Sequence, residues 1–193
     1  LSDSPFNRLR MTIFPMDYTY VTNDPQRYPF PRKGKDEHDF STFNVDFFRH
    51  LEQRIIDLMN LGIQADLILF HPYDRWGYAE MEKSVDDFYL RYVLARFSAF
   101  RNVWWQVASE YDVIDSKTVD DWDRFFEIIY ENDPYEHLRS INNRNQPYDN
   151  TKPWVTHCSL QGVGYSNINE WRQRYQKPIL FEEFEYEGNL IQS

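Results

Sequence analysis

The sequence predicts an α/β domain whose parallel strands form part of a (β/α)8 barrel, and three observations support this fold class. Short runs of β-forming residues alternate along the chain with amphipathic helical stretches, as in a parallel sheet with crossover helices. The chain has only 6 Gly and no G-x-G-x-x-G motif, which disfavours a doubly wound dinucleotide fold. Polar and aromatic residues follow several of the predicted strands, where barrel enzymes place their sites.

The composition indicates one globular domain and argues against several kinds of partner. A chain of 193 residues with 41% hydrophobic residues can bury a sizeable core. The formal net charge of -10 disfavours nucleic acid and anionic membranes, because both attract clustered Lys and Arg. No apolar run is long enough to span a membrane, and no signal peptide is visible. The single cysteine, Cys158, excludes an internal disulfide and a cysteine-only zinc site.

The first strand, helix and second strand are predicted within residues 6–70. The strand is expected at residues 6–15 ("FNRLRMTIFP"), where β-formers alternate until a proline closes the run. A helix follows within residues 43–62, with Gly62 as its expected C-terminal cap. Residues 63–70 ("IQADLILF") form the next strand. The apolar stripe of the helix comprises Phe47, Phe48, Leu51, Ile55, Leu58 and Met59.

The second helix and the third strand follow within residues 84–108. Ser84 and Asp87 have the spacing of a capping box at the start of the helix. The run "VWWQVA" at residues 103–108 is apolar apart from one glutamine, which is typical of a fully buried strand. The buried side of the helix is expected to include Val85, Phe88, Tyr92 and Phe100.

The rest of the chain continues the alternation. Thr118 and Asp121 form another capping signature at the start of "TVDDWDRFFEIIYEN". The apolar face of this third helix comprises Trp122, Phe125, Phe126 and Ile129. The remaining predicted elements are a short strand at residues 137–141, a strand at 153–160, a helix at 167–176 and a last strand at 178–183.

Four of the predicted strand ends carry chemistry-bearing residues, in the runs "HPYDRW", "SEYD", "THCSLQ" and "EEFEYEG". The carboxyl ends of parallel barrel strands meet at one face, so these residues are expected to gather there. A full barrel has eight strands, and the sequence yields six candidates. We therefore expect residues 1–193 to be a single catalytic-barrel segment of a longer protein, holding about the second to seventh strands.

Six blocks in order resemble the apiosidase-like, DUF4038-type glycoside hydrolases, which are barrels similar to clan A and family 5 glycosidases. They are "FNRLRM", "ADLILFHPYDRWG", "VWWQVASEYD", "DPYEHLRSI", "PWVTHCSLQ" and "KPILFEEFEYEG", and the resemblance extends over nearly the whole chain. The resemblance implies a retaining glycosidase that cleaves O-glycosidic bonds in a polysaccharide or oligosaccharide, with no cofactor. A polymeric substrate further implies a secreted or periplasmic enzyme.

The resemblance also assigns the two catalytic carboxyl groups. Clan A enzymes place an acid/base Glu after the fourth strand and a nucleophile Glu after the seventh, which correspond here to Glu110 and Glu183. The spacing from Lys-Pro, and the Tyr-Glu-Gly run at residues 186–188, favour Glu183 over its rival Glu182. The chain departs from the pattern at Ser109, where the clan has Asn, and at Asn142, where a His is expected.

The chemistry of glycoside hydrolysis explains why two glutamates are needed. One carboxyl group must donate a proton, while the other must be ionised; the two lie about 5–5.5 Å apart in retaining enzymes and about 6.5–9.5 Å apart in inverting ones. Burial by Trp104, Trp105 and Tyr111 is expected to raise the pKa of Glu110 and so favour the donor role. Hydrogen bonds from Arg10, or from a nearby Tyr or His, are expected to keep Glu183 charged.

The predicted substrate-binding residues combine polar groups with aromatic rings, as ligand pockets commonly do. A tryptophan on a polar loop suits stacking against a sugar face. The resemblance implies that the two histidines that end strands line the cleft, and that His157 positions the substrate or the nucleophile. Ser159 is a weaker candidate. The predicted set is Arg10, His71, Tyr73, Asp74, Trp76, Ser109, Tyr111, His157 and Gln161.

Three alternative functions remain open at the level of sequence. A metal-dependent amidohydrolase-type barrel would need a ligand cluster such as His-x-His, and none of the 5 His residues has this spacing. A carbohydrate-binding barrel with altered catalysis is suggested by Ser109. A purely structural domain would lack a cleft between Glu110 and Glu183. The sequence itself predicts no metal.

Overall fold

The computed structural model describes residues 1–19, 23–34, 37–161 and 165–183. This part of the chain alternates strands and helices in the predicted order, and the α/β class is confirmed. The elements are β1 (Arg8–Thr12), α1 (Val45–Asn60), β2 (Gln64–Phe70), α2 (Lys83–Phe97), β3 (Val103–Ala108), α3 (Val119–Asn132), β4 (Arg139–Ser140), β5 (Cys158–Gln161), α4 (Ile168–Tyr175) and β6 (Ile179–Glu183).

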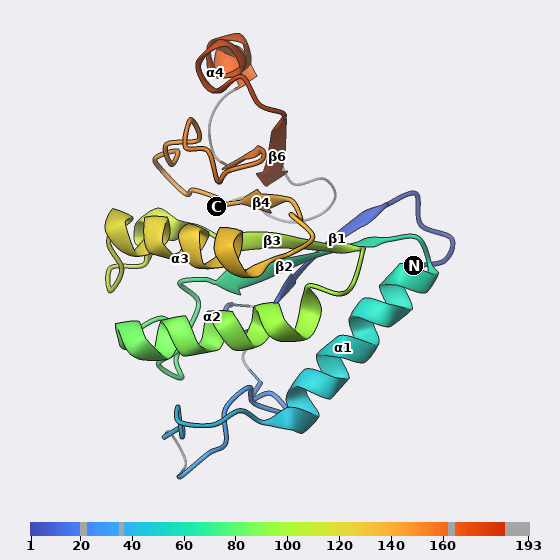
Figure 1. Cartoon of the computed structure of the whole chain (residues 1–193), viewed down its shortest axis with the longest axis vertical. Coiled ribbons are helices and arrows are strands. Elements are labelled where there is room, and N and C mark those ends of the chain that lie inside the picture. The colour runs from blue at the N-terminus through green and yellow to red at the C-terminus, as the bar shows by residue number, and fades with distance from the viewer. Residues whose placement is uncertain (20–22, 35–36, 162–164, 184–193) are drawn as a thin grey trace.

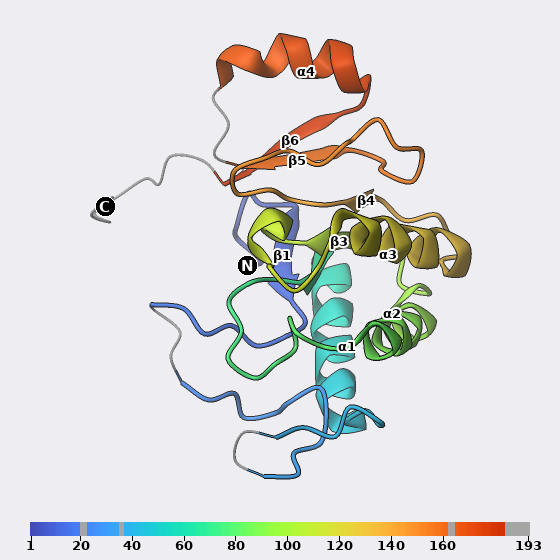
Figure 2. The ribbon, with the colours of Figure 1, turned by 90° about the vertical axis from the view of Figure 1, so that its left-hand side faces the viewer.

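All described strand pairs are parallel. β1 to β4 form one sheet in sequential order, and β5 pairs with β6 in a second sheet. A single parallel bridge between Asn142 and Ser159 connects the two sheets. Helices α1, α2 and α3 cover one face of the first sheet, while β6 and α4 lie beyond β4 (Figures 1 and 2). Sequential parallel order with helices on one side is the arrangement that barrel strands have.

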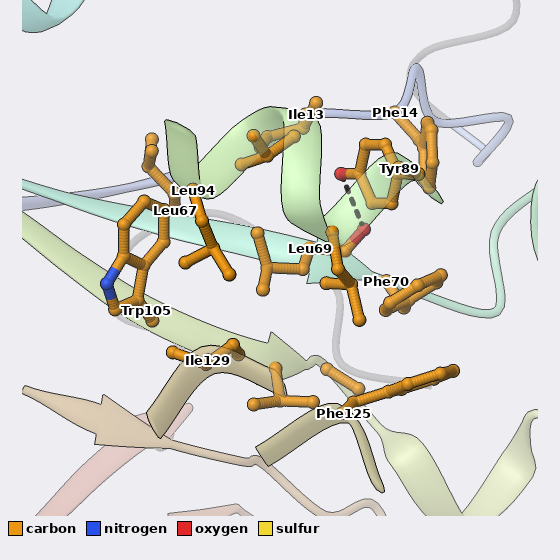
Figure 3. Packing of buried hydrophobic residues seen from close by; sticks show 14 of the residues in the cluster. Ile13, Phe14, Leu67, Leu69, Phe70, Tyr89, Leu94, Trp105, Phe125 and Ile129 are labelled. Carbon is orange, nitrogen blue, oxygen red and sulfur yellow. Dashed lines mark hydrogen bonds between the residues drawn. The ribbon is translucent and has the colours of Figure 1, made fainter. Parts of the chain in front are cut away.

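The hydrophobic core lies between the first sheet and its helices. Because side chains alternate along a strand, Leu67, Leu69 and Trp105 face the helices, where α2 and α3 residues cover them (Figure 3). The hydroxyl of the buried Tyr89 in α2 donates to the Leu69 carbonyl at 3.1 Å, which satisfies the only polar atom of that ring. Because these apolar side chains of the strands point to the helices, the polar side chains of the strands point to the opposite face of the sheet.

Helices α1 and α3 confirm the predictions made for them. In α1, four residues of the predicted stripe are buried, while Phe47 and Met59 are partly exposed. Gly62 follows the C-terminal cap with a left-handed φ of +74°, which glycine adopts without steric cost. At the start of α3, Thr118 and Asp121 form the predicted reciprocal capping box, and the whole predicted apolar face is buried.

Helix α2 corrects the prediction in two respects. It begins at Lys83, with Glu82 at the N-cap position and no side-chain cap, so Ser84 and Asp87 lie inside the helix. The face on the sheet is shifted by one position from the predicted one, and Phe88 is exposed. The predicted face instead meets Phe43, from the segment before α1, which stacks on Tyr92 and tilts against Phe88. The buried set is Asp86, Tyr89, Leu90, Val93, Leu94 and Phe97.

Three strands are shorter than predicted. β1 occupies only half of residues 6–15, and β4 is reduced to Arg139–Ser140. β5 begins at Cys158 rather than at residue 153. The segment before β5 is instead held by the Thr156 hydroxyl, which donates to the Arg139 carbonyl and accepts from the Arg139 backbone N–H. Local side-chain bonds of this kind compete with strand pairing.

Candidate active site

The inner face of the first sheet carries two arginines from β1. Arg8 and Arg10 are two residues apart, so both point to this face. Arg10 lies beside Asp66 in the register of β1 and β2. Its guanidinium donates to Gln106 Oε1 at 3.0 Å and to Ser109 Oγ at 3.3 Å. The strands therefore hold a fixed cation where the predicted site should lie.

A pocket of about 490 Å³ opens at the carboxyl ends of β1, β2 and β3. Its volume is typical of pockets that bind small ligands. It brings together the predicted nucleophile and four of the predicted substrate-binding residues. The lining residues are Arg10, Met11, Thr12, Met16, Ile68, His71, Tyr73, Ser109 and Glu183.

Glu110 follows β3 directly and is only 4% exposed. Its backbone is left-handed, with φ 52° and ψ 49°, which is uncommon for a residue with a side chain and directs the chain out of the strand. Its Oε2 accepts a hydrogen bond from the Tyr73 hydroxyl at 2.7 Å, and its Oε1 accepts one from the Gln161 amide at 2.8 Å. Arg144 Nη1 lies 3.7 Å from Oε2. Two neutral donors therefore hold this buried carboxyl group.

The last strand ends in two consecutive glutamates that both contact arginines of the inner face. The pairing of β5 and β6 shifts register here, so that Gln161 pairs with Glu183 and Glu182 is the additional residue. The Glu182 side chain is fully buried, and Arg8 donates to both of its oxygens at 3.0 and 2.6 Å. The Glu183 side chain is 32% exposed, and its Oε1 lies 3.5 Å from Arg10 Nη1. Only Glu183 reaches the pocket.

Gln161 and Tyr73 bring the two predicted catalytic glutamates to the same rim. Gln161 is the strand partner of Glu183, and its side chain donates to Glu110. Tyr73 lines the pocket together with Glu183, and its hydroxyl also donates to Glu110. Burial, and then the adjacent Glu110 carboxyl, raise the pKa of Tyr73 well above its usual value, so the phenol remains a donor.

Beneath the pocket lies a cluster of buried charged groups. Arg8 Nη1 lies 3.4 Å from Asp66 Oδ2, but this guanidinium is already engaged by Glu182. Burial raises the pKa of Asp66 to about 7, and the nearby Glu182 carboxylate adds to the rise. His157 packs edge-on against Trp104, with ring centres 5.4 Å apart, and burial lowers its pKa to about 4. At neutral pH the histidine is therefore neutral, and Asp66 holds its proton more tightly than a solvated carboxyl group does.

Comparison with known proteins identifies the family of this chain. The profile of the "Apiosidase-like, catalytic domain" family matches residues 3–193. The chain belongs to the apiosidase-like catalytic domain family. No protein with a curated description matches the chain.

Solved structures similar to this apiosidase-like domain are glycoside hydrolases by their descriptions. A protein of Bacteroides vulgatus ATCC 8482, inferred to be a glycoside hydrolase, is 41% identical with a TM-score of 0.93; the match covers 98% of this chain and 40% of that one. A family 5 glycoside hydrolase of the same organism is 15% identical, with a TM-score of 0.60. The match covers 92% of this chain and 42% of that one. A GH113 β-1,4-mannanase is 16% identical, with a TM-score of 0.53. The match covers 80% of this chain and 56% of that one. The last two show the likeness to barrel enzymes at the level of fold. The apiosidase-like domain spans 40% of the length of its 41% identical relative.

Two residues of the loop after β2, Asp74 and Trp76, are predicted to bind substrate but do not line the pocket. Trp76 is only 8% exposed and packs against Tyr28 and Tyr78, so its ring offers no open stacking surface and that prediction is wrong. The Asp74 carboxylate accepts hydrogen bonds from the Trp76 and Ala79 backbone N–H groups, both at 2.7 Å. Asp74 therefore shapes the loop and does not line the pocket.

The aromatic residues around Glu110 also differ from the prediction. Trp105 faces the helices, where its indole N–H donates to Asp133 at 3.0 Å. Tyr111 turns away from the pocket; its hydroxyl donates to the Gln146 carbonyl at 3.0 Å, and burial raises its pKa to about 12. The predicted burial of Glu110 is confirmed, but the side chains that contact its carboxyl group are those of Tyr73, Gln161 and Arg144, not these rings.

The two strand-end histidines occupy different depths. His71 lines the pocket, and its Nε2–H donates to the Phe14 carbonyl at 3.1 Å, which fixes the tautomer. Burial lowers the pKa of His71, so the ring is neutral. His157 lies among the buried charges beneath the pocket and is not one of the residues that line it.

The departures from the family pattern have clear positions. Ser109 lines the pocket and receives a hydrogen bond from Arg10. Asn142 is buried; its backbone N–H donates to the Ala108 carbonyl, and its carbonyl accepts from the Tyr111 N–H. The Tyr-Glu-Gly run at residues 186–188 lies outside the described residues.

Several site residues were not predicted. Arg8 and Asp66 carry a sequence signal, since a second Arg two residues before Arg10 and an Asp inside an apolar strand must both face a polar interior. Arg144 carries none. Among the described residues, no group of three His, Cys, Asp or Glu side chains is placed to hold a metal. Within the same part of the chain, no helix is long and apolar enough to cross a membrane.

Proposed function

We propose that the apiosidase-like domain supplies the two catalytic glutamates of a retaining glycoside hydrolase built on a (β/α)8 barrel, in which these six strands correspond to the second to seventh. The observation that carries the proposal is the different setting of the two carboxyl groups at one rim. Glu110 is buried, accepts hydrogen bonds from Tyr73 and Gln161, and lies 3.7 Å from Arg144. A guanidinium, that of Arg10, accompanies the more exposed Glu183. We assign the buried Glu110 as the acid/base and Glu183, which lines the pocket, as the nucleophile.

The proposed reaction has two displacements. Glu183 attacks the anomeric carbon of the sugar in the pocket while the Glu110 carboxyl group gives its proton to the departing glycosidic oxygen. Glu110, now a carboxylate, then takes a proton from water, whose oxygen attacks the same carbon and releases Glu183. Arg10 holds Glu183 and Ser109, while Tyr73 orients Glu110. Retention requires the two carboxyl groups to lie about 5–5.5 Å apart when the sugar is bound.

The proposed substrate is a polysaccharide or oligosaccharide, and a polymeric substrate implies a secreted or periplasmic enzyme. The likeness to glycoside hydrolases, one of them described as a β-1,4-mannanase, supports a carbohydrate as the substrate class. A panel of plant and microbial polysaccharides and aryl glycosides, tested with the full-length protein, is the first experiment. The stereochemistry of the released sugar distinguishes retention from inversion.

The decisive test replaces each glutamate with glutamine in the full-length protein. Glu110→Gln and Glu183→Gln are each expected to reduce hydrolysis at least about 100-fold, because general acid–base catalysis alone contributes 10²–10⁴-fold. Glu127→Gln, on the exposed side of α3, is the matched control and should retain full activity. Full activity in either of the first two variants would remove that residue from the mechanism. If Glu182→Gln abolishes turnover while Glu183→Gln does not, the neighbouring residue is the nucleophile.

One alternative follows from Ser109. This side chain occupies the position of the clan's Asn, and its hydroxyl already accepts a hydrogen bond from Arg10. The alternative is a domain that binds carbohydrate without hydrolysing it. Tight binding of an oligosaccharide with no product from any member of the panel would favour this second function.

A further inference from the structure

An exposed aromatic ring lies just outside the pocket, beside Tyr73. The Tyr18 ring is 46% exposed, and its centre lies 4.8 Å from that of Tyr73, with an interplanar angle of 69°. On the inner side, Tyr73 stacks on His71, with ring centres 6.4 Å apart. The three rings therefore follow one another from the buried His71, through Tyr73, to the exposed Tyr18. The hydroxyl of the middle ring is the one that donates to Glu110.

The Tyr18 ring is held in place by its own segment. The Asp17 backbone N–H donates to the Tyr73 carbonyl at 2.9 Å. The Asp17 carboxylate accepts from Arg75 at 3.2 Å, so a second residue of the loop after β2 secures the same segment. Met16, one residue earlier, lines the pocket. A tyrosine fixed at its backbone loses little side-chain entropy on binding and offers a large apolar face with a polar end.

We propose that Tyr18 is the stacking platform for the sugar unit on the leaving-group side of the scissile bond. This inference rests on the proposed function, because Glu110 defines that side as the donor to the departing oxygen. The sugar that reacts occupies the pocket between Arg10 and Tyr73, next to Glu183. The next unit must pass Glu110, and among the described residues Tyr18 is an exposed ring that packs against Tyr73, whose hydroxyl binds Glu110. The platform predicted at Trp76 is thus supplied by the segment that follows β1.

A guanidinium completes the leaving-group position. Arg144 lies 3.7 Å from Glu110 Oε2 and is half exposed, so its remaining N–H groups can reach sugar hydroxyls. Its loop is held firmly, because the Asp112 carboxylate accepts from the backbone N–H groups of Arg144, Asn145 and Gln146 at 2.6, 2.7 and 2.9 Å. An aromatic face with a few placed donors is the usual composition of a ligand site.

The test measures oligosaccharide affinity in a form that cannot turn over. Full-length Glu110→Gln protein is titrated with oligosaccharides released by mild acid from mannan, xylan, cellulose and pectin. Adding Tyr18→Ala should weaken binding roughly 5- to 10-fold, as expected for one ring contact. Tyr18→Phe, which keeps the ring, should bind within about 2-fold of the parent. Tyr135→Ala removes another exposed tyrosine, at the opposite end of the strands, and should change nothing.

Steady-state kinetics give a second readout that a merely structural role would not produce. In the active protein, Tyr18→Ala should raise KM for oligosaccharides with kcat unchanged, since a platform binds ground state and transition state equally. Equal affinity and equal KM for Tyr18→Ala and its parent would overturn the inference while leaving the catalytic glutamates in place. If the parent binds none of the oligosaccharides, the proposed function fails and this inference fails with it.

Discussion

The replacement Asp66→Asn tests the buried charge cluster beneath the pocket. Asp66 is buried, and its pKa is raised from 3.8 to about 7, so between these values the folded protein keeps a proton that the unfolded chain has released. Its share of the stability is fully present below about pH 4 and is lost as the pH rises through about 7. A shift of this size corresponds to about 4 kcal/mol. Asparagine resembles the protonated acid and does not titrate, so it escapes this loss.

The assay is urea denaturation of the full-length protein, followed by tryptophan fluorescence between pH 4 and pH 8. The free energy of unfolding of Asp66→Asn minus that of the parent should be near zero at the acid end. It should grow by about 4 kcal/mol towards pH 8. Asp115→Asn replaces an exposed aspartate and should give a difference that does not change with pH.

The neighbouring glutamate provides a further control for the same reasoning. The Glu182 carboxylate contributes to the raised pKa of Asp66. When both proteins also carry Glu182→Gln, the difference in free energy of unfolding between Asp66→Asn and its parent should therefore depend less on pH. A difference that is flat, or that falls as the pH rises, would refute the reasoning. It would show that Arg8 holds Asp66 ionised together with Glu182.

The remaining predictions concern one hydrogen bond in the site and one in the scaffold. Tyr73→Phe removes the hydroxyl that donates to Glu110 and should lower kcat/KM about 10- to 100-fold, the usual cost of leaving a buried polar atom without its partner. Unchanged kcat/KM with any substrate of the panel would contradict its orienting role. Thr118→Ala breaks the capping box of α3 and should lower the free energy of unfolding by about 1 kcal/mol with activity unchanged, which denaturation and kinetics measure together.

The sequence predicts an element best where local rules and packing agree. Thr118 and Asp121 stand immediately before an apolar stripe with helical spacing, and both the cap and the buried face are confirmed. Ser84 and Asp87 have the same spacing, but the helix begins before them. Nearly every turn of α2 offers apolar residues on more than one face, so periodicity could not choose between them. The choice depends on Phe43, which is distant in sequence and covers the second face.

Site residues could likewise be predicted where local sequence patterns suffice, and could not where folded contacts decide the direction of a side chain. Glu110, Glu183, Arg10 and Tyr73 were predicted as site residues, and the structure brings all four to one rim. Trp76 was predicted as an exposed platform because its neighbours are polar. Asp74 folds the loop back on itself, however, and thereby directs the indole inward. The direction of a loop side chain depends on hydrogen bonds that composition does not reveal.

A register shift between β5 and β6 gives the two consecutive glutamates, Glu182 and Glu183, different surroundings. In a regular strand, Glu182 and Glu183 would point to opposite faces, and one of them would leave the interior. The register shift against β5 lets both carboxylates contact the inner-face arginines. Arg10 lies 3.4 Å from one and 3.5 Å from the other, while Arg8 binds only the buried one. Glu182 is therefore placed to hold the two arginines, and this arrangement leaves Glu183 as the one of the two carboxylates that lines the pocket.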